Sequence, residues 1–301
     1  MEKKGILLAV IAAALYALSI PISKILLDYV PSIMMAAFLY IGAGVGMFFV
    51  IAGKKLLNLK RKEEHLSKKE IPYIMILIFF DIAAPISLMF GLKLTTASNA
   101  SLLNTFEIVI TSLIALFIFK TKIHPRVWIG IALITVSTII LSLKDVSGLS
   151  FSYGSLLVLL SCILWGFENN ITKKISGKNP KEIVMIKDIF AGFGSLIIAL
   201  SFGERTGAYA AILITMLLGF VAYGLSSMAY IYSQRRLGAP KASLYYAVAP
   251  FIGVIFSFLI FRDKIGVIYI ISLVIMLIGA WFAASNKPLF NKKPSQNIKN
   301  L

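Results

Sequence analysis

The sequence predicts an all-α integral membrane protein with ten transmembrane helices, built as two inverted five-helix repeats. Hydrophobic residues make up 59% of the 301 residues and charged residues only 14%. Such a chain is too apolar for a soluble protein, whose surface must be largely polar. Apolar runs of about 20 residues fit helices that cross a bilayer, whereas strands of a membrane barrel would alternate over about 10 residues.

The first half of the chain contains five apolar segments. Lys3 and Lys4 precede the first of them, which is too long for the core of a signal peptide. In the second segment, Gly42 and Gly46 have the spacing of small residues that allow two helices to pack closely. We expect helices over residues 5–27, 32–52, 71–92, 97–119 and 127–143, which form a first repeat over residues 1–143.

The second half has the same pattern and ends in a polar tail. We expect helices over residues 153–175, 182–202, 208–233, 242–261 and 265–284, which form a second repeat over residues 151–285. Residues 286–301 mix Asn, Lys, Pro, Ser and Gln without periodicity. This composition predicts a disordered cytoplasmic tail.

The two halves also match each other residue by residue. The stretch of residues 76–123 returns about 140 residues later without a gap, which indicates an internal repeat. Ala97, Ala100, Ser101, Leu102, Ile110 and Ile118 correspond to Ala239, Ala242, Ser243, Leu244, Ile252 and Ile260. An odd number of helices in each half forces the halves to insert with opposite orientations. Inverted halves that open alternately to either side are the architecture of a secondary transporter.

The loop charges predict how the chain is oriented. Most of the lysines and arginines fall in connections on one side, together with both termini. By the positive-inside rule that side is cytoplasmic, so we expect a multi-pass protein of the cytoplasmic membrane. The formal charge of +17 is explained by this topology and does not indicate a nucleic-acid partner.

Two carboxyl residues lie deep inside apolar segments of the first half. Asp81 and Glu107 are each placed about 15 Å from a membrane surface at 1.5 Å per residue. An ionised carboxylate at that depth must face a wet cavity, find a partner or take up a proton. We expect Glu107 to bind the coupling ion or the substrate, with Asp81 as its partner. The alternative is that both are neutral packing residues near Pro85.

A second polar cluster is expected in the second half. Glu168, Asn169 and Asn170 lie late in one helix, and Lys187 and Asp188 lie early in the next, so antiparallel neighbours bring them to a similar depth. An ion pair between Glu168 and Lys187 is expected. It either stabilises the helix hairpin or binds the substrate, and the residues alone do not decide between these roles.

Aromatic and amide side chains complete the expected site. Rings with hydroxyl groups suit the wall of a cavity for an amphipathic solute. The candidates are Tyr16, Trp165, Tyr223, Tyr230, Tyr245 and Tyr246. Asn104 lies about one helical turn before Glu107, where it can orient that carboxylate or the solute.

Several of these segments resemble a known family. They are Leu164-Trp165-Gly166-Phe167-Glu168-Asn169-Asn170-Ile171-Thr172, Ile186-Lys187-Asp188-Ile189-Phe190-Ala191-Gly192, and Ala247-Val248-Ala249-Pro250-Phe251-Ile252-Gly253. They are similar to motifs of paired EamA-type domains in the drug/metabolite transporter superfamily, except that Glu168 replaces an expected Asp and Asp188 an expected Gly. The resemblance implies a ten-helix carrier whose fifth and tenth helices are peripheral to a central cavity.

Together these features predict a secondary active transporter that moves a small polar or amphipathic metabolite by alternating access, coupled to protons. Export as the direction is what the resemblance implies. The alternative is a membrane-embedded enzyme that acts on a lipid-linked substrate through intramembrane carboxylates. The lone Cys162 and the two distant histidines offer no metal site or catalytic dyad, so we expect no catalytic residue and no cofactor. The expected partners are the metabolite and membrane lipid, and a homodimer is left open.

Overall fold

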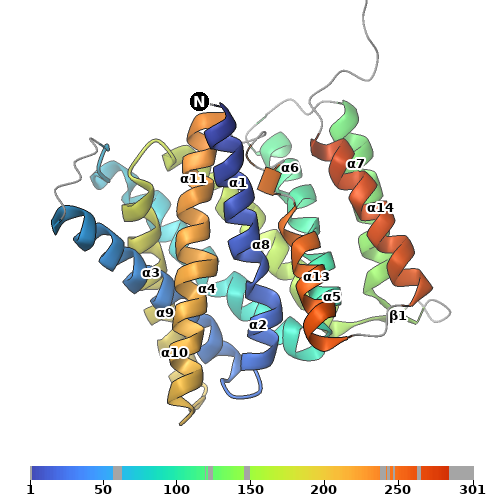
Figure 1. Ribbon diagram of the computed structural model, residues 1–301, viewed down its shortest axis with the longest axis horizontal. Helices are drawn as coiled ribbons and strands as arrows, with labels where there is room; N and C mark the ends of the chain where they lie inside the picture. Colours follow the sequence, from blue (N-terminus) through green and yellow to red (C-terminus); the bar gives the residue numbers. More distant parts are fainter. Residues whose placement is uncertain are drawn as a thin grey trace, which may run out of the picture.

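Long apolar helices make up nearly all of the computed structural model (Figure 1). The structure describes residues 2–56, 63–118, 120, 125–145, 150–237, 242, 245–246, 248–262 and 266–284. Within these ranges seven helical stretches are long and apolar enough to cross a membrane. Three shorter apolar stretches cover Trp128–Ile140, Ala249–Phe261 and Val267–Phe282. The all-α class is therefore confirmed, while the expected tail of residues 286–301 lies outside the described residues.

The helices of the first half follow the expected segments closely. They are α1 (Glu2–Ala17), α2 (Ser19–Leu26), α3 (Ser32–Leu56), η1 (Lys68–Glu70), α4 (Ile71–Leu94), α5 (Ala97–Leu103), α6 (Phe106–Phe117) and α7 (Pro125–Ser142). A short antiparallel hairpin of β1 (Leu143–Asp145) and β2 (Ser150–Phe151) then leads into the second half. This hairpin was not expected from the sequence.

The helices of the second half begin with one whose bounds match the expectation. They are α8 (Tyr153–Ile175), α9 (Pro180–Ser201), α10 (Tyr209–Leu218), the π-helix η2 (Gly219–Leu225), α11 (Ser226–Leu237), α13 (Ala249–Phe261) and α14 (Val267–Ala284). The expected start of the ninth helix, at residues 242–248, falls partly outside the described residues.

Three segments that were expected to be single helices are interrupted. Pro21 lacks the N–H that would bond to Ala17, and its ring crowds that carbonyl, so α1 ends at Ala17. Asn104 and Thr105 separate α5 from α6, in keeping with the preference of short polar side chains for helix ends. The third segment contains η2, and π-helical turns are frequent at functional sites.

The sequence repeat recurs in the backbone. Among the described non-glycine residues, only Lys120 and Arg262 have a positive φ, of 51° and 50°. The repeat alignment pairs these two positions with each other. Arg262 caps α13, and Lys120 follows α6 at the equivalent place. The two copies thus share an unusual left-handed turn at the end of the corresponding helix.

Most of the packing joins one half of the chain to the other. The helix α3 packs against α9, α10 and η2, while α4 packs against α8 and α9. On the other side of the molecule α7 packs against α14, and the Ser137 hydroxyl donates to the Ser272 carbonyl at 2.7 Å. This pair lies at one edge of the bundle (Figure 1). The core is therefore an interface between the halves.

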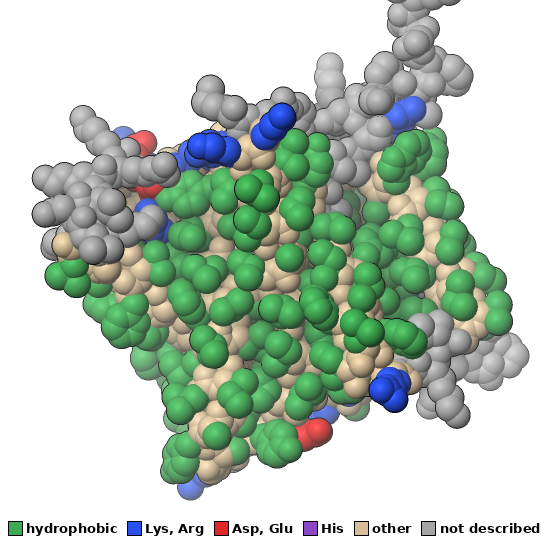
Figure 2. Space-filling model, in the orientation of Figure 1, with side chains coloured by type: hydrophobic (Ala, Val, Ile, Leu, Met, Phe, Trp, Pro, Cys, Tyr) green, Lys and Arg blue, Asp and Glu red, His purple; other side chains and the backbone are tan. Residues whose placement is uncertain are grey.

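The outer surface is apolar over most of its height. Figure 2 shows a broad band of hydrophobic side chains, with lysines and arginines gathered at the face that carries the N-terminus and few charges at the opposite face. Large exposed hydrophobic side chains of the described residues include Phe49, Phe193, Ile197 and Leu213. A surface of this kind is stable only in lipid, so the chain is a multi-pass membrane protein.

Glycines on α3 allow close contact between the halves, as their spacing predicted. A methyl group at Gly42 would lie 2.0 Å from the carbonyl oxygen of Met216, and one at Gly46 would lie 2.0 Å from the Phe220 ring. At Gly53, near the end of the same helix, a methyl group would meet nothing within 4 Å. The expected close packing through Gly42 and Gly46 is confirmed.

We therefore predict that Gly42→Ala destabilises the protein and that the matched control Gly53→Ala does not. Overpacking at Gly42 should cost about 1–3 kcal/mol, whereas alanine at Gly53 should be neutral or stabilise the helix by up to about 1 kcal/mol. Thermal unfolding of the purified variants in detergent measures both effects. Equal melting temperatures for the two variants would show that the contact is not as close as described.

Candidate functional site

A buried ammonium group lies at the centre of the polar residues. Lys187 Nζ on α9 is 2.7 Å from Asp81 Oδ2 on α4, 3.0 Å from Asp188 Oδ1 and 3.5 Å from Glu168 Oε1 on α8. All four residues are less than 9% exposed. One positive charge is thus shared by carboxylates from both halves of the chain.

Hydroxyl groups complete the surroundings of this cluster. Tyr40 on α3 donates to Asp81 Oδ1 at 3.2 Å, and the Lys187 ammonium lies 5.9 Å from the centre of the Tyr40 ring. Thr172 donates to Glu168 Oε1 at 2.8 Å from one turn further along α8. Hydrogen bonds of this kind to charged groups are among the stronger ones in proteins.

The turn between α8 and α9 explains why Glu168 and Lys187 meet. Asn179 caps the start of α9 by accepting from the Lys181 amide at 3.2 Å, and Pro180 occupies the first helical position. This tight connection brings the end of α8 beside the start of α9 at equal depth. The structure contains the expected ion pair between Glu168 and Lys187.

The expected pairing of Asp81 with Glu107 is replaced by the ion pair of Asp81 with Lys187. The face of α4 that bears Asp81 is directed at α9, where an opposite charge is available. Glu107 instead lies in the first turn of α6, and its Oε1 accepts from Asn169 Nδ2 on α8 at 2.6 Å. Because α6 begins just before Glu107, the carboxylate lies at a helix N-terminus, where the partial positive charge of the helix dipole stabilises a negative group.

Two further asparagines lie close to Glu107. Asn170 donates to the Thr111 carbonyl on α6 at 3.0 Å and to the Gly166 carbonyl at 2.8 Å. Asn104, in the break between α5 and α6, donates to the Tyr16 hydroxyl at 3.4 Å. Asn170 therefore joins α8 to α6, and Asn104 joins the start of α6 to the aromatic residues.

Aromatic rings fill the space between the two halves beside these groups. The ring centroid of Tyr16 lies 6.3 Å from that of Trp165, 5.7 Å from that of Tyr223 and 5.9 Å from that of Tyr246. Tyr223 belongs to η2, and its ring centroid lies 5.3 Å from that of Tyr40, the hydroxyl partner of Asp81. The aromatic cluster therefore lies between Tyr40 on one side and Asn104 on the other.

The structure brings together most of the expected site residues. Tyr245 is half-buried, but its neighbour Tyr246 makes the ring contacts with Tyr16 and Tyr230. The sequence reasoning missed Tyr40 and Ser19, whose hydroxyl lies 3.4 Å from that of Tyr223. A tyrosine in the middle of an apolar segment was the available signal for Tyr40. In the described part of the chain, no three His, Cys, Asp or Glu side chains are grouped to hold a metal.

A groove of about 440 Å³ lies away from this centre, between α3 and α10. Gly42, Gly46 and Phe49 line one side, and Met216, Leu217 and Phe220 line the other. Its lining is apolar and it opens onto the lipid-facing surface. It suits an acyl chain of the membrane better than a polar solute.

Known proteins are similar to nearly the whole chain. The model of the EamA-like transporter family matches residues 3–143 and 152–285. An uncharacterized transporter of Methanothermobacter thermautotrophicus is 26% identical over 291 residues, which cover 92% of this chain and 85% of that protein. The uncharacterized transporter YyaM of Bacillus subtilis is 22% identical over 248 residues, with 79% and 81% covered. A crystal structure with 14% identity shares the fold, with a TM-score of 0.68 over 94% of this chain and 96% of that chain.

We predict that Lys187→Met destabilises the protein strongly, because it leaves Asp81 buried without its cation. Breaking a buried pair from one side costs about 3–5 kcal/mol. Adding Asp81→Asn to Lys187→Met should recover part of the lost stability, because the neutral amide at position 81 needs no counter-charge. Thermal unfolding of the four variants of this cycle in detergent measures the coupling.

Lys173→Met is the matched control, because Lys173 is an exposed lysine of the same helix hairpin. This variant should change the melting temperature little. A Lys187→Met protein as stable as the wild type would contradict the view that this ion pair supports the fold.

Proposed function

The chain belongs to the EamA-like transporter family, and on this basis we propose that it is a secondary active transporter of a small polar or amphipathic metabolite. It crosses the cytoplasmic membrane with both termini inside and works by alternating access between two inverted repeats. The distribution of basic residues supports this orientation, and the packing of α3 and α4 on the second half supports two bodies that move against each other. Export is the direction that the family resemblance implies.

The observation that carries the proposal is an excess of carboxylates in the buried centre. Among the described residues, Asp81, Asp188, Glu168 and Glu107 interact with or lie near one another, and Lys187 is the one ammonium group in contact with them. A net negative charge buried in a membrane is costly. Protons, or a solute with a positive group, must therefore neutralise it, and this supports coupling to protons.

Glu107 is the carboxylate best placed for an exchangeable ligand. Asp81 is almost fully buried and bound by both Lys187 and Tyr40. Glu107 is only half-buried, and within the described part of the chain its side chain accepts one hydrogen bond, from Asn169. Asn104, about one turn earlier, connects this place to the Tyr16 hydroxyl. We assign Glu107 to the coupling ion or substrate, and Asp81 to holding Lys187 in place.

The aromatic cluster supports an amphipathic solute. Tyr16, Trp165, Tyr223 and Tyr246 offer ring faces with hydroxyl groups at their edges, contributed by elements of both halves. Such surfaces contact apolar and polar parts of a small molecule at once. Asn104 and Asn169, beside Glu107, would provide the hydrogen bonds that orient it.

We predict that Glu107→Gln lowers solute exchange by at least about tenfold and makes the remainder insensitive to pH. A hydrogen bond to a charged group is worth about 1.5–3 kcal/mol, and the amide cannot carry a proton. Exchange of a labelled pool of amino acids, nucleosides and sugar phosphates into proteoliposomes at two pH values measures this.

Glu107→Asp is the matched control, because it keeps the carboxylate and should retain pH dependence. Unchanged exchange and pH dependence in Glu107→Gln would refute the assignment of this residue. Recovery of a chemically altered solute would instead indicate a membrane enzyme.

A further inference from the structure

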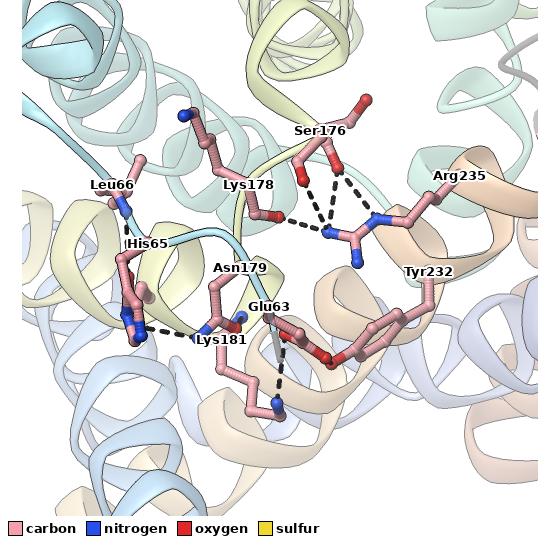
Figure 3. A network of polar contacts seen from close by, with 11 residues as sticks. Glu63, His65, Leu66, Ser176, Lys178, Asn179, Lys181, Tyr232 and Arg235 are labelled. Carbon is pink, nitrogen blue, oxygen red and sulfur yellow. Dashed lines mark hydrogen bonds and ion pairs between the residues drawn. The ribbon is translucent and has the colours of Figure 1, made fainter. Parts of the chain in front are cut away.

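Residues 63–70 lie in the connection from α3 to α4 in the first half. They bind two helices of the second half, α9 and α11, and the turn between α8 and α9 (Figure 3). We call this segment the 63–70 clamp. It lies at the face of the molecule that carries the N-terminus (Figure 1). It has its own internal order, because Ser67 and Glu70 form a capping box at the start of η1. The clamp therefore continues into α4 as one ordered piece.

Glu63 joins the clamp to α9 and α11. Its Oε1 accepts from the Tyr232 hydroxyl at 2.6 Å, and its Oε2 lies 3.4 Å from Lys181 Nζ. The side chains of Glu63 and Lys181 are only 9% and 8% exposed. An ion pair this well shielded is screened less by salt than an exposed one.

Glu182 holds the next residues of the clamp against the start of α9. Its Oε2 accepts from the Leu66 amide at 3.1 Å, and its Oε1 pairs with His65. The backbone N–H of Asn179 donates to the backbone carbonyl of Glu64 at 2.8 Å, so backbone and side-chain hydrogen bonds both join the clamp to the start of α9. Three consecutive residues of the clamp are thus fixed to the turn before α9.

Lys178, in the turn between α8 and α9, pairs with Glu64 and lies 3.7 Å from Glu70. The hydrogen bond to Glu64, with the negative charges of Glu64 and Glu70, raises the pKa of Lys178 above its ordinary value. A raised lysine pKa stabilises the folded state below the unfolded pKa, and this contribution is lost only as the pH rises through the folded pKa. The pair is therefore intact throughout the neutral range.

Arg235, on α11, makes this end of the second half a single body. Its Nη2 donates to the carbonyls of Ser176 at 3.2 Å and Gly177 at 3.3 Å, and also to that of Lys178. The end of α8, the start of α9 and the end of α11 are thereby tied together. The clamp closes on this body from the other half.

We propose that the 63–70 clamp locks the N-terminal face of the transporter shut and must release before that face can open. The inference rests on the proposed function, because it needs two halves that separate. Its contacts are polar, and the pairs that His65 and Glu64 make have one member exposed to solvent. Such exposed pairs are individually weak enough to break and re-form.

The clamp and the buried ion pair join the same two helices at two depths. The clamp fixes the start of α4 to the start of α9 through Glu182, and Asp81 and Lys187 join these helices further in. A proton or solute that weakens the inner pair therefore leaves the clamp as the polar contact between α9 and the segment that leads into α4. Release of the clamp is the step that would follow.

The single cysteine of the chain supplies a readout that needs no known substrate. Cys162 on α8 is fully buried, and its Sγ lies 3.6 Å from Asn104 Oδ1 beside the candidate site. A membrane-impermeant maleimide reaches it only when the centre opens. Membrane vesicles of the two opposite orientations present each face separately to the reagent.

We expect Glu63→Gln and Glu182→Gln each to raise the rate of Cys162 alkylation from the N-terminal face by at least about twofold, because each removes an ion pair that joins the halves. Exchanging the charges, with Glu63→Lys and Lys181→Glu together, should return the rate toward that of the wild type. Neither single variant should raise alkylation from the opposite face.

Glu204→Gln is the matched control at the other end of the same helices. Glu204, between α9 and α10, accepts from the amides of Ile33 and Met34 at 3.3 and 2.8 Å, so it also joins the halves. It should not raise alkylation from the N-terminal face. Unchanged rates in both clamp variants would overturn the proposal, and so would an equal rise from both faces, which marks general loosening. If the wild-type protein failed to exchange solute in proteoliposomes, that result would instead count against the proposed function.

Discussion

The structure depends on one buried ammonium group that both halves of the chain share. Lys187 comes from the second half, and its shortest ion pair is with Asp81 of the first half. Removing Lys187 would leave Asp81 inside the membrane without its counter-charge, which costs more than the pair contributes when intact. The contact therefore fixes how α4 faces α9, and the Tyr40 hydroxyl and the turn before α9 hold its two members in place.

We propose that two carboxylates near this pair have different roles: Asp81 holds Lys187 in place, and Glu107 binds the coupling ion or the substrate. Asp81 is bound by both Lys187 and Tyr40, whereas Glu107 lies half-buried in the first turn of α6, where Asn169 is its donor among the described residues. The breaks at Pro21 and Asn104 and the π-helix η2 bring polar or aromatic groups to the boundary between the halves. At the N-terminal face, the 63–70 clamp joins the halves again through pairs that include the more exposed ones of His65 with Glu182 and Glu64 with Lys178. Strong contacts inside and reversible ones at the surface suit a protein that opens alternately.

Much of this arrangement was predictable from the sequence, for identifiable reasons. Apolar runs and their flanking residues gave the helix over residues 153–175, and the short turn after it implied the pairing of Glu168 with Lys187. The pairing of Asp81 was not predictable, because a helix that is apolar all round carries no stripe to show which side faces which neighbour. For the same reason the sequence did not show that Tyr40, a tyrosine in the middle of an apolar segment, faces Asp81. The clamp was hidden because polar connections have no periodicity, and only the folded arrangement shows that Glu63 reaches Tyr232.

We propose that protons balance the excess buried carboxylates as solute moves. A pH-sensitive dye trapped in proteoliposomes, read while a gradient of an exchanged solute runs down, tests this directly. We expect a proton flux that is proportional to the solute flux and runs in the opposite direction. Solute that crosses at full rate without any movement of protons would contradict it.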